Sequence, residues 1–185
     1  MWDTRIQEAQ KVQWTVEHFL QKKETGLFTD MEEWERTQFY LNEAIEKLLL
    51  THGKTPEEEA EIVLAILMGY RITIRNDHHI RLALQRAESI FPILNDSILK
   101  CYLAVFCYGE SFDKEKGHLA RRMLKELKQN GTKLEAMEEL LESMEEFEEE
   151  KWLYLIGATI FFAIFAPLNK LKPKKLCSEV IHAAS

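Results

Sequence analysis

Two helix-forming stretches carry almost no charge, although 30% of the 185 residues are charged. The first runs over residues 60–70 (AEIVLAILMGY) and the second over residues 97–108 (SILKCYLAVFCY). A helix that is apolar on nearly all sides is stable in water only when other elements cover most of it. The two stretches therefore predict a central helix pair, surrounded by charged amphipathic segments within one small domain.

Periodicity and capping signals predict an all-α fold of about seven helices. The clearest start is Thr55-Pro-Glu-Glu58, where Thr55 can cap, Pro56 suits the first helical position and Glu58 completes a capping box. We expect the helices from Asp3 to Lys23, from Asp30 to His52, from Thr55 into the basic stretch 71–75, from His78 to Ile90, from Asp96 or Ser97 to Gly109, from Phe112 to Gln129, and from Thr132 onward.

The first predicted helix has its inward positions at three- and four-residue spacing: Ile6, Ala9, Gln13, Val16 and Leu20. On the second, Trp34 is expected on the inward side with Leu41 and Ile45. The alternating fragment at residues 71–75 (RITIR) is too short to found a sheet. We therefore predict one compact helical regulatory domain over residues 1–150 and an apolar and basic tail over residues 151–185.

The charge balance points to a protein partner. The chain has 31 acidic and 24 basic residues, a net charge of -7. This argues against direct nucleic-acid binding, because domains that bind phosphate usually show a basic face. The three cysteines (Cys101, Cys107 and Cys177) include no CxxC pair, which is typical of reduced thiols. No apolar signal region opens the chain, so we expect a cytoplasmic protein.

No pattern in the sequence predicts an enzyme, a metal site or a cofactor. The adjacent His78 and His79 point about 100° apart on a helix and cannot close one metal site without distant ligands. Solvated turn histidines are the commoner outcome for such a pair. The sequence also lacks a Gly-flanked nucleophile turn and a Gly-rich phosphate loop.

Two groups of residues are candidates for contact with a partner. One is the acidic face of the last predicted helix, formed by Glu138, Glu139, Glu142, Glu145 and Glu146. Like charges at this spacing repel one another, and a basic partner would relieve the repulsion. The other is a polar rim at the ends of the two core helices, formed by Tyr70, Arg71, Tyr108 and Glu110. An ordinary solvated face and packed tyrosines with satisfied hydroxyls are the respective alternatives.

The tail contains an uncharged run over residues 152–168 (WLYLIGATIFFAIFAPL), followed by four lysines up to Lys175. As a helix this run would be about 25 Å long, slightly short of the roughly 30 Å core of a bilayer. A membrane-tethered helical adaptor is therefore the alternative function. A helix docked on the domain and a tail without a defined structure are the other interpretations of this run.

The two core stretches also carry a family resemblance. The pattern Thr55-Pro-Glu-Glu-Glu-Ala, followed by residues 64–70 (LAILMGY), resembles the UpxZ family. The later run at residues 97–101 (SILKC), then residues 107–113 (CYGESFD), is similar to the second half of the family pattern. The stretch ARRMLKEL from Ala120 continues the likeness, which covers about residues 30–130.

The resemblance implies a small cytoplasmic regulator of capsular polysaccharide operons. Members of the family antagonise transcription antitermination by interfering with NusG-like factors, the UpxY proteins. The resemblance implies no catalytic residues and no cofactor, and it assigns no binding residues to this sequence. The tail after about residue 151 lies outside the likeness.

Overall fold

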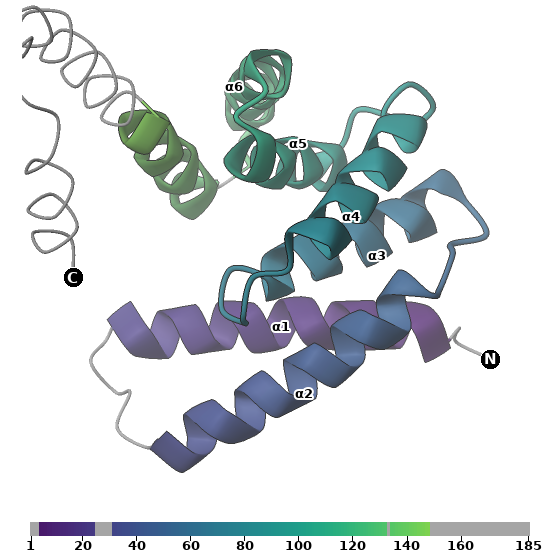
Figure 1. Cartoon of the computed structure of the whole chain (residues 1–185). Helices are drawn as coiled ribbons and strands as arrows, with labels where there is room; N and C mark the ends of the chain where they lie inside the picture. Colours follow the sequence, from purple (N-terminus) through teal and green to yellow (C-terminus); the bar gives the residue numbers. More distant parts are fainter. Residues whose placement is uncertain (1–3, 25–30, 133, 149–185) are drawn as a thin grey trace, which may run out of the picture. The chain divides into compact units, whose positions relative to one another are not determined.

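The computed structural model describes residues 4–24, 31–132 and 134–148. Helices and turns make up these residues, which confirms the all-α prediction. Six helices are labelled in Figure 1: α1 (Thr4–Glu24), α2 (Met31–Leu49), α3 (Pro56–Gly69), α4 (Asp77–Ile90), α5 (Ile98–Ser111) and α6 (Lys114–Gln129). A further helix covers residues 135–148.

The helix starts follow from short polar side chains that cap the first turn. Thr55 Oγ1 accepts a hydrogen bond from the Glu58 backbone N–H at 3.2 Å, and Pro56 occupies the first position of α3. The reciprocal half of the predicted box is displaced by one residue, because Glu58 accepts the Lys54 N–H instead of that of Thr55. Ser97 caps α5 by accepting the Lys100 N–H at 3.3 Å.

The predicted helix ends differ from the observed ones at the core helices. Helix α3 ends at Gly69 and does not continue into residues 71–75, which form a turn instead. The N–H groups of Arg71 and Ile72 bond to the carbonyls of Met68 and Gly69 in this turn. Helix α5 continues to Ser111, two residues beyond the predicted end.

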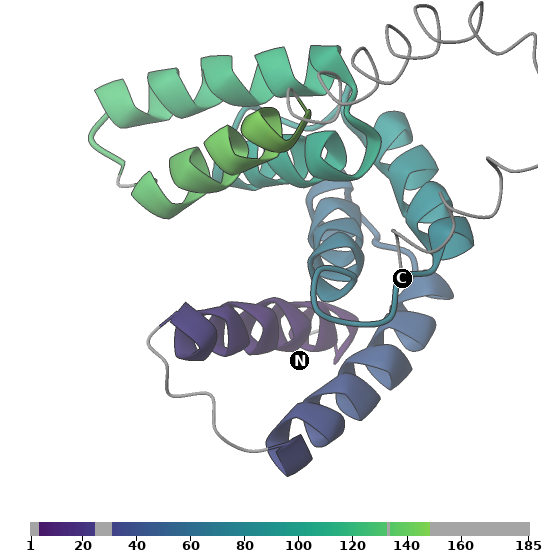
Figure 2. The same cartoon turned by 60° about the vertical axis from the view of Figure 1, so that its left-hand side comes forward.

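The predicted central helix pair is confirmed in α3 and α5. Every residue of α3 from Ile62 to Gly69 is buried, as is every residue of α5 from Leu103 to Tyr108. Helix α3 contacts α1, α2, α4 and α5, whereas α5 contacts α3, α4 and α6. Figures 1 and 2 both show α3 between the α1–α2 pair and α5. Each large apolar side chain buried here contributes about 1.5–3 kcal/mol of transfer free energy.

The inward face of α1 is displaced from the predicted one. Its buried residues are Ala9, Val12, Val16 and Phe19. Gln13 instead lies at the edge of this face and donates a 2.8 Å hydrogen bond to the Glu61 carboxylate. Leu20 is 37% exposed, so the prediction that it points inward is wrong.

The chain divides into two compact units, Met1–Leu141 and Glu142–Ser185. In the first unit, Leu134, Met137 and Leu141 are buried, and Lys128 at the end of α6 bonds to Glu138 at 2.7 Å. The predicted domain boundary at residue 150 lies outside the described residues and stays a prediction.

The apolar run at residues 152–168, for which a membrane anchor is one of the alternative interpretations, also lies outside the described residues. Within residues 4–24, 31–132 and 134–148, no helix is both long enough and apolar enough to cross a bilayer.

Candidate protein-binding surface

The two rim tyrosines belong to the core. Tyr70 is buried and its hydroxyl forms a 2.7 Å hydrogen bond with His79 Nδ1. Burial, with a smaller contribution from Glu46, raises the pKa of Tyr70 to about 12. Tyr108 is 3% exposed and packs edge-on against Phe112. Both residues therefore present little surface to a partner.

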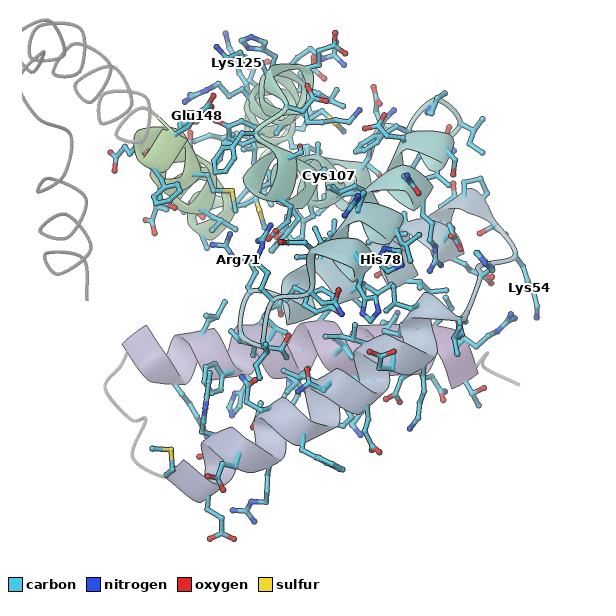
Figure 3. All side chains as sticks on the ribbon, in the orientation of Figure 1. Lys54, Arg71, His78, Cys107, Lys125 and Glu148 are labelled. Carbon is cyan, nitrogen blue, oxygen red and sulfur yellow. The ribbon has the colours of Figure 1, made fainter. Side chains whose placement is uncertain are left out.

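His79 differs from the expected solvated turn histidine. It lies in the first turn of α4, where its side chain is 19% exposed, while the neighbouring His78 is exposed. Its bond to Tyr70 ties the start of α4 to the end of α3. Figure 3 labels His78 on α4.

Glu110 forms a structural link at the other end of the predicted rim. Its side chain is only 4% exposed and bonds to Arg75 Nη1 at 2.7 Å. Arg75 also bonds to Asp77 at 2.6 Å, so one guanidinium joins the turn after α3 to the ends of two helices. Arg71, which is labelled in Figure 3, is the residue of the predicted polar rim that remains exposed, and it lies in the turn between α3 and α4.

The acidic face of the helix at residues 135–148 is partly neutralised. Glu138 is bonded to Lys128, and Glu145 is half-buried. Glu139, Glu142 and Glu146 are exposed and follow one another at helical spacing. These three residues are the part of the predicted acidic surface that is most available to a basic partner.

Helix α6 carries a basic surface that the total charge did not predict. Its sequence has six basic and two acidic residues. Lys114, Arg121, Arg122 and Lys125 are all exposed on it. The expectation that the chain has no basic face is therefore wrong for this helix, because a net charge averages over surfaces of opposite sign.

A groove lies where the end of α1, the start of α2 and the α3–α4 turn meet. It has a volume of about 590 Å³ and is lined mostly by apolar side chains: Phe19, Leu20, Met31, Trp34, Gln38, Arg71, Ile72, Thr73 and Ile74. Phe19 and Ile72 are buried and form its floor. Met31 and Ile74 stand at its rim, 71% and 81% exposed.

The groove is held open by contacts between its three walls. Phe19 and Trp34 pack together with ring centroids 4.9 Å apart, which fixes the end of α1 against the start of α2. Gln38 donates a side-chain hydrogen bond to the Ile72 carbonyl, and this bond holds the turn against α2. Thr73 Oγ1 bonds back to the Gly69 carbonyl at 3.1 Å. The chain's own side chains therefore hold the three walls together.

The sequence patterns do not predict this groove. They assign Leu20 and Trp34 to the inward faces of their helices, and they indicate a short strand-like fragment at residues 71–75. A usable signal was present, because Ile72 and Ile74 are apolar residues in a stretch too short to be a strand.

The described residues offer little for metal or thiol chemistry. Within residues 4–24, 31–132 and 134–148, no three His, Cys, Asp or Glu side chains are grouped to hold a metal ion. Cys101 and Cys107 are free and buried, and burial raises their pKa values to about 11 and about 12. A buried thiol with a raised pKa is a poor nucleophile. Cys177 lies outside the described residues.

Comparison with known proteins adds a family to this geometry. Residues 9–109 match the UpxZ family of transcription anti-terminator antagonists. The fold is similar to the crystal structure of a transcription anti-terminator antagonist UpxZ from Bacteroides uniformis, with a TM-score of 0.66 and 22% identity. That alignment covers 92% of this chain and 100% of the other. No curated protein matches the chain. Because the family match spans more than half of its length, the chain belongs to the UpxZ family of transcription anti-terminator antagonists.

Proposed function

We propose that this protein inhibits transcription antitermination of capsular polysaccharide operons by binding a NusG-like factor of the UpxY type in the cytoplasm. The observation that carries the proposal is the family match over residues 9–109. The proposed mode of action is non-catalytic. The buried, high-pKa thiols and the structural roles of Tyr70, His79 and Glu110 are consistent with it.

A direct test is transcription through a terminator in a purified system that contains polymerase and an UpxY-type factor. We expect the factor to raise read-through and the added protein to lower it again, in proportion to its concentration. The same protein should leave read-through unchanged when the factor is omitted. Lowered read-through without the factor, or no effect with it, would contradict the proposal.

The exposed glutamates supply a second element of the proposal. NusG-like factors engage polymerase and nucleic acid, so a basic surface on such a factor could meet Glu139, Glu142 and Glu146. Opposite charges of this kind mainly speed association and make it sensitive to salt.

Charge reversal tests this element. The triple variant Glu139→Lys, Glu142→Lys, Glu146→Lys should bind an UpxY-type factor more slowly and with a weaker dependence on salt. Glu138 is left unchanged because its carboxylate is bonded to Lys128. The matched control reverses Glu35, Glu43 and Glu57, which are exposed on α2 and α3 and give the same change in net charge. Equal rates for the two variants would exclude the acidic helix from the mechanism.

A further inference from the structure

Exposed apolar side chains surround the groove. Met31 and Ile74 are 71% and 81% exposed, and Leu20 beside them is 37% exposed. These side chains come from three separate elements and converge on one hollow with a buried apolar floor. Single exposed apolar residues are common, but a cluster around a concave surface typically marks a binding site.

Arg71 gives the groove a chemical preference. It is the one charged residue among the described residues of the lining, and it is exposed. Within the part of the chain that the structure describes, its guanidinium has no ion-pair or hydrogen-bond partner. Arg75, four residues further on, bonds to two carboxylates. A guanidinium beside an apolar hollow is suited to bind a carboxylate in a bidentate pair.

We propose that the groove binds an apolar segment of the antitermination factor that carries an acidic residue to pair with Arg71. This inference rests on the proposed function and assigns it a docking site. A volume of about 590 Å³ accommodates a few apolar side chains, such as the anchors that one face of an amphipathic helix presents. Every lining residue lies within the range that matches the family.

Other occupants fit the groove less well. The apolar run at residues 152–168 of this chain contains no acidic residue, so it offers Arg71 no carboxylate. A second copy of the chain would bring its own net charge of -7 against an identical charge. A segment of another protein satisfies both the apolar surface and the free guanidinium.

Binding of the full-length protein to a purified UpxY-type factor tests the apolar part of the site. Ile74→Glu and Met31→Glu should each weaken the affinity at least about tenfold, because a charge would enter the apolar contact. Two matched controls are available at sites outside the groove lining. Leu50→Glu changes a residue that is 87% exposed, and Phe39→Glu changes one on α2 that is 67% exposed. Both should bind as the wild type does.

Arg71 is tested in the same assay. Arg71→Glu should weaken binding at least about tenfold, and Arg71→Lys should retain part of the affinity because the charge remains. Arg81→Glu is the control, since Arg81 is exposed on α4 and lies outside the groove lining. Equal losses in Arg71→Glu and Arg81→Glu would show a general effect of charge and overturn the role of Arg71.

A small probe tests the groove without the factor. The dye 8-anilinonaphthalene-1-sulfonate joins an apolar ring system to one anionic group, which is the chemistry proposed for the ligand. The full-length native protein should enhance its fluorescence, and Ile74→Glu and Arg71→Glu should each reduce the enhancement. Leu50→Glu should leave it unchanged, and added factor should displace the dye.

The outcomes separate the two proposals. If the wild type binds the factor and the groove variants bind equally well, the docking site is overturned and the proposed function stands. If the wild type fails to bind the factor, the proposed function and this partner are both overturned. Self-association that Ile74→Glu abolishes, measured by sedimentation, would identify a second copy as the occupant and overturn the proposed one.

Discussion

The two ends of α2 meet their neighbours in different ways, although an ion pair with the same N–O distance lies beside each end. At the C-terminal end, Arg86 Nε lies 2.6 Å from Glu59, and both side chains are 12% exposed. At the N-terminal end, Lys22 Nζ lies 2.6 Å from Glu33, with side chains 30% and 41% exposed. We call the C-terminal end the sealed end, because polar bonds between partly buried groups close it. We call the N-terminal end the open end, because it borders the groove.

The sealed end is held by one guanidinium that serves three helices. Arg86 on α4 donates to the carbonyls of Leu48 and Leu49 at the end of α2 and to that of Thr51 just beyond it. It also bonds to Glu59 on α3. The carbonyls that end a helix have no partner within it. Arg86 supplies side-chain donors to those of Leu49 and Thr51, and the Leu48 carbonyl also accepts the Thr51 N–H.

Among the residues that the structure describes, the open end has no comparable polar network around its groove. There one side-chain bond from Gln38 holds the turn against α2, and apolar side chains stand at the rim. Under the proposed docking site, the polar bonds that stabilise the fold lie at one end of α2 and the binding groove lies at the other. The fold tolerates exposed Met31 and Ile74 because the sealed end and the buried α3 stabilise it without them.

The largest expected effect comes from removing the buried cation. Arg86→Met should lower the free energy of unfolding by about 3 kcal/mol, because it removes the cation beside Glu59 and the side-chain donor to the carbonyls of Leu49 and Thr51. Urea unfolding of the variant and the wild type measures the difference. A loss below about 1 kcal/mol would show that the sealed end does not stabilise the fold.

A somewhat smaller effect is expected at Gly53. A Cβ atom at this position would lie 2.2 Å from the backbone nitrogen of Glu59, too close for the backbone to remain in place. Gly53→Ala should therefore cost about 2 kcal/mol in the free energy of unfolding. Gly131→Ala is not a suitable control because Gly131 has a positive φ of 83°. A surface change such as Glu57→Ala on α3 serves instead.

Acid should weaken the sealed end. Burial raises the pKa of Glu59, but hydrogen bonds from Arg86 and from the Gly53 N–H outweigh it, so the pKa falls below its ordinary value of 4.5. The unfolded chain then binds the proton more tightly, and stability is lost as the pH falls through and below about 4.5. Glu59→Gln should be less stable at neutral pH and should show a shallower acid dependence. If the free energy of unfolding fell with pH at the same slope in Glu59→Gln and in the wild type, Glu59 would be excluded as a source of the acid sensitivity.

The ion pair at the open end should matter little. Lys22→Met should change the free energy of unfolding by about 0.5 kcal/mol or less, and added salt should shrink the difference further. Urea unfolding at low and high salt measures it. A loss comparable with that of Arg86→Met would break the distinction between the two ends.

The groove rim should be the least sensitive region. Ile74→Glu and Met31→Glu should leave the free energy of unfolding within about 0.5 kcal/mol of the wild type, because both side chains are mostly exposed. Thermal unfolding of both variants provides the check. A large loss would mean that these residues serve the fold and not a partner.

Much of the fold follows from sequence patterns that act locally. The apolar runs at residues 60–70 and 97–108 predict the buried helices α3 and α5, and Thr55 and Ser97 predict where they begin. These features can be predicted from the sequence because a cap or an all-apolar helix is defined by residues adjacent in the chain. The inward face of α1 was harder to predict from the sequence, since Gln13 and Leu20 fit the same helical period as Val12 and Phe19.

The groove depends on contacts between residues far apart in the chain. Phe19 meets Trp34, and Gln38 meets the turn at Ile72, across connections that no periodicity encodes. Arg86 was missed for the same reason, because its partners lie 27 to 38 residues away. Sequence patterns therefore predicted the elements, while the surfaces that the elements create together required the structure.

Hydrogen–deuterium exchange of the full-length protein, with and without an UpxY-type factor, tests the central claim most directly. The groove account predicts that the factor slows exchange at the start of α2 and in the turn at residues 71–74, while residues 48–59 at the sealed end exchange as before. Protection confined to the sealed end or to residues 135–148, with the groove unchanged, would contradict it.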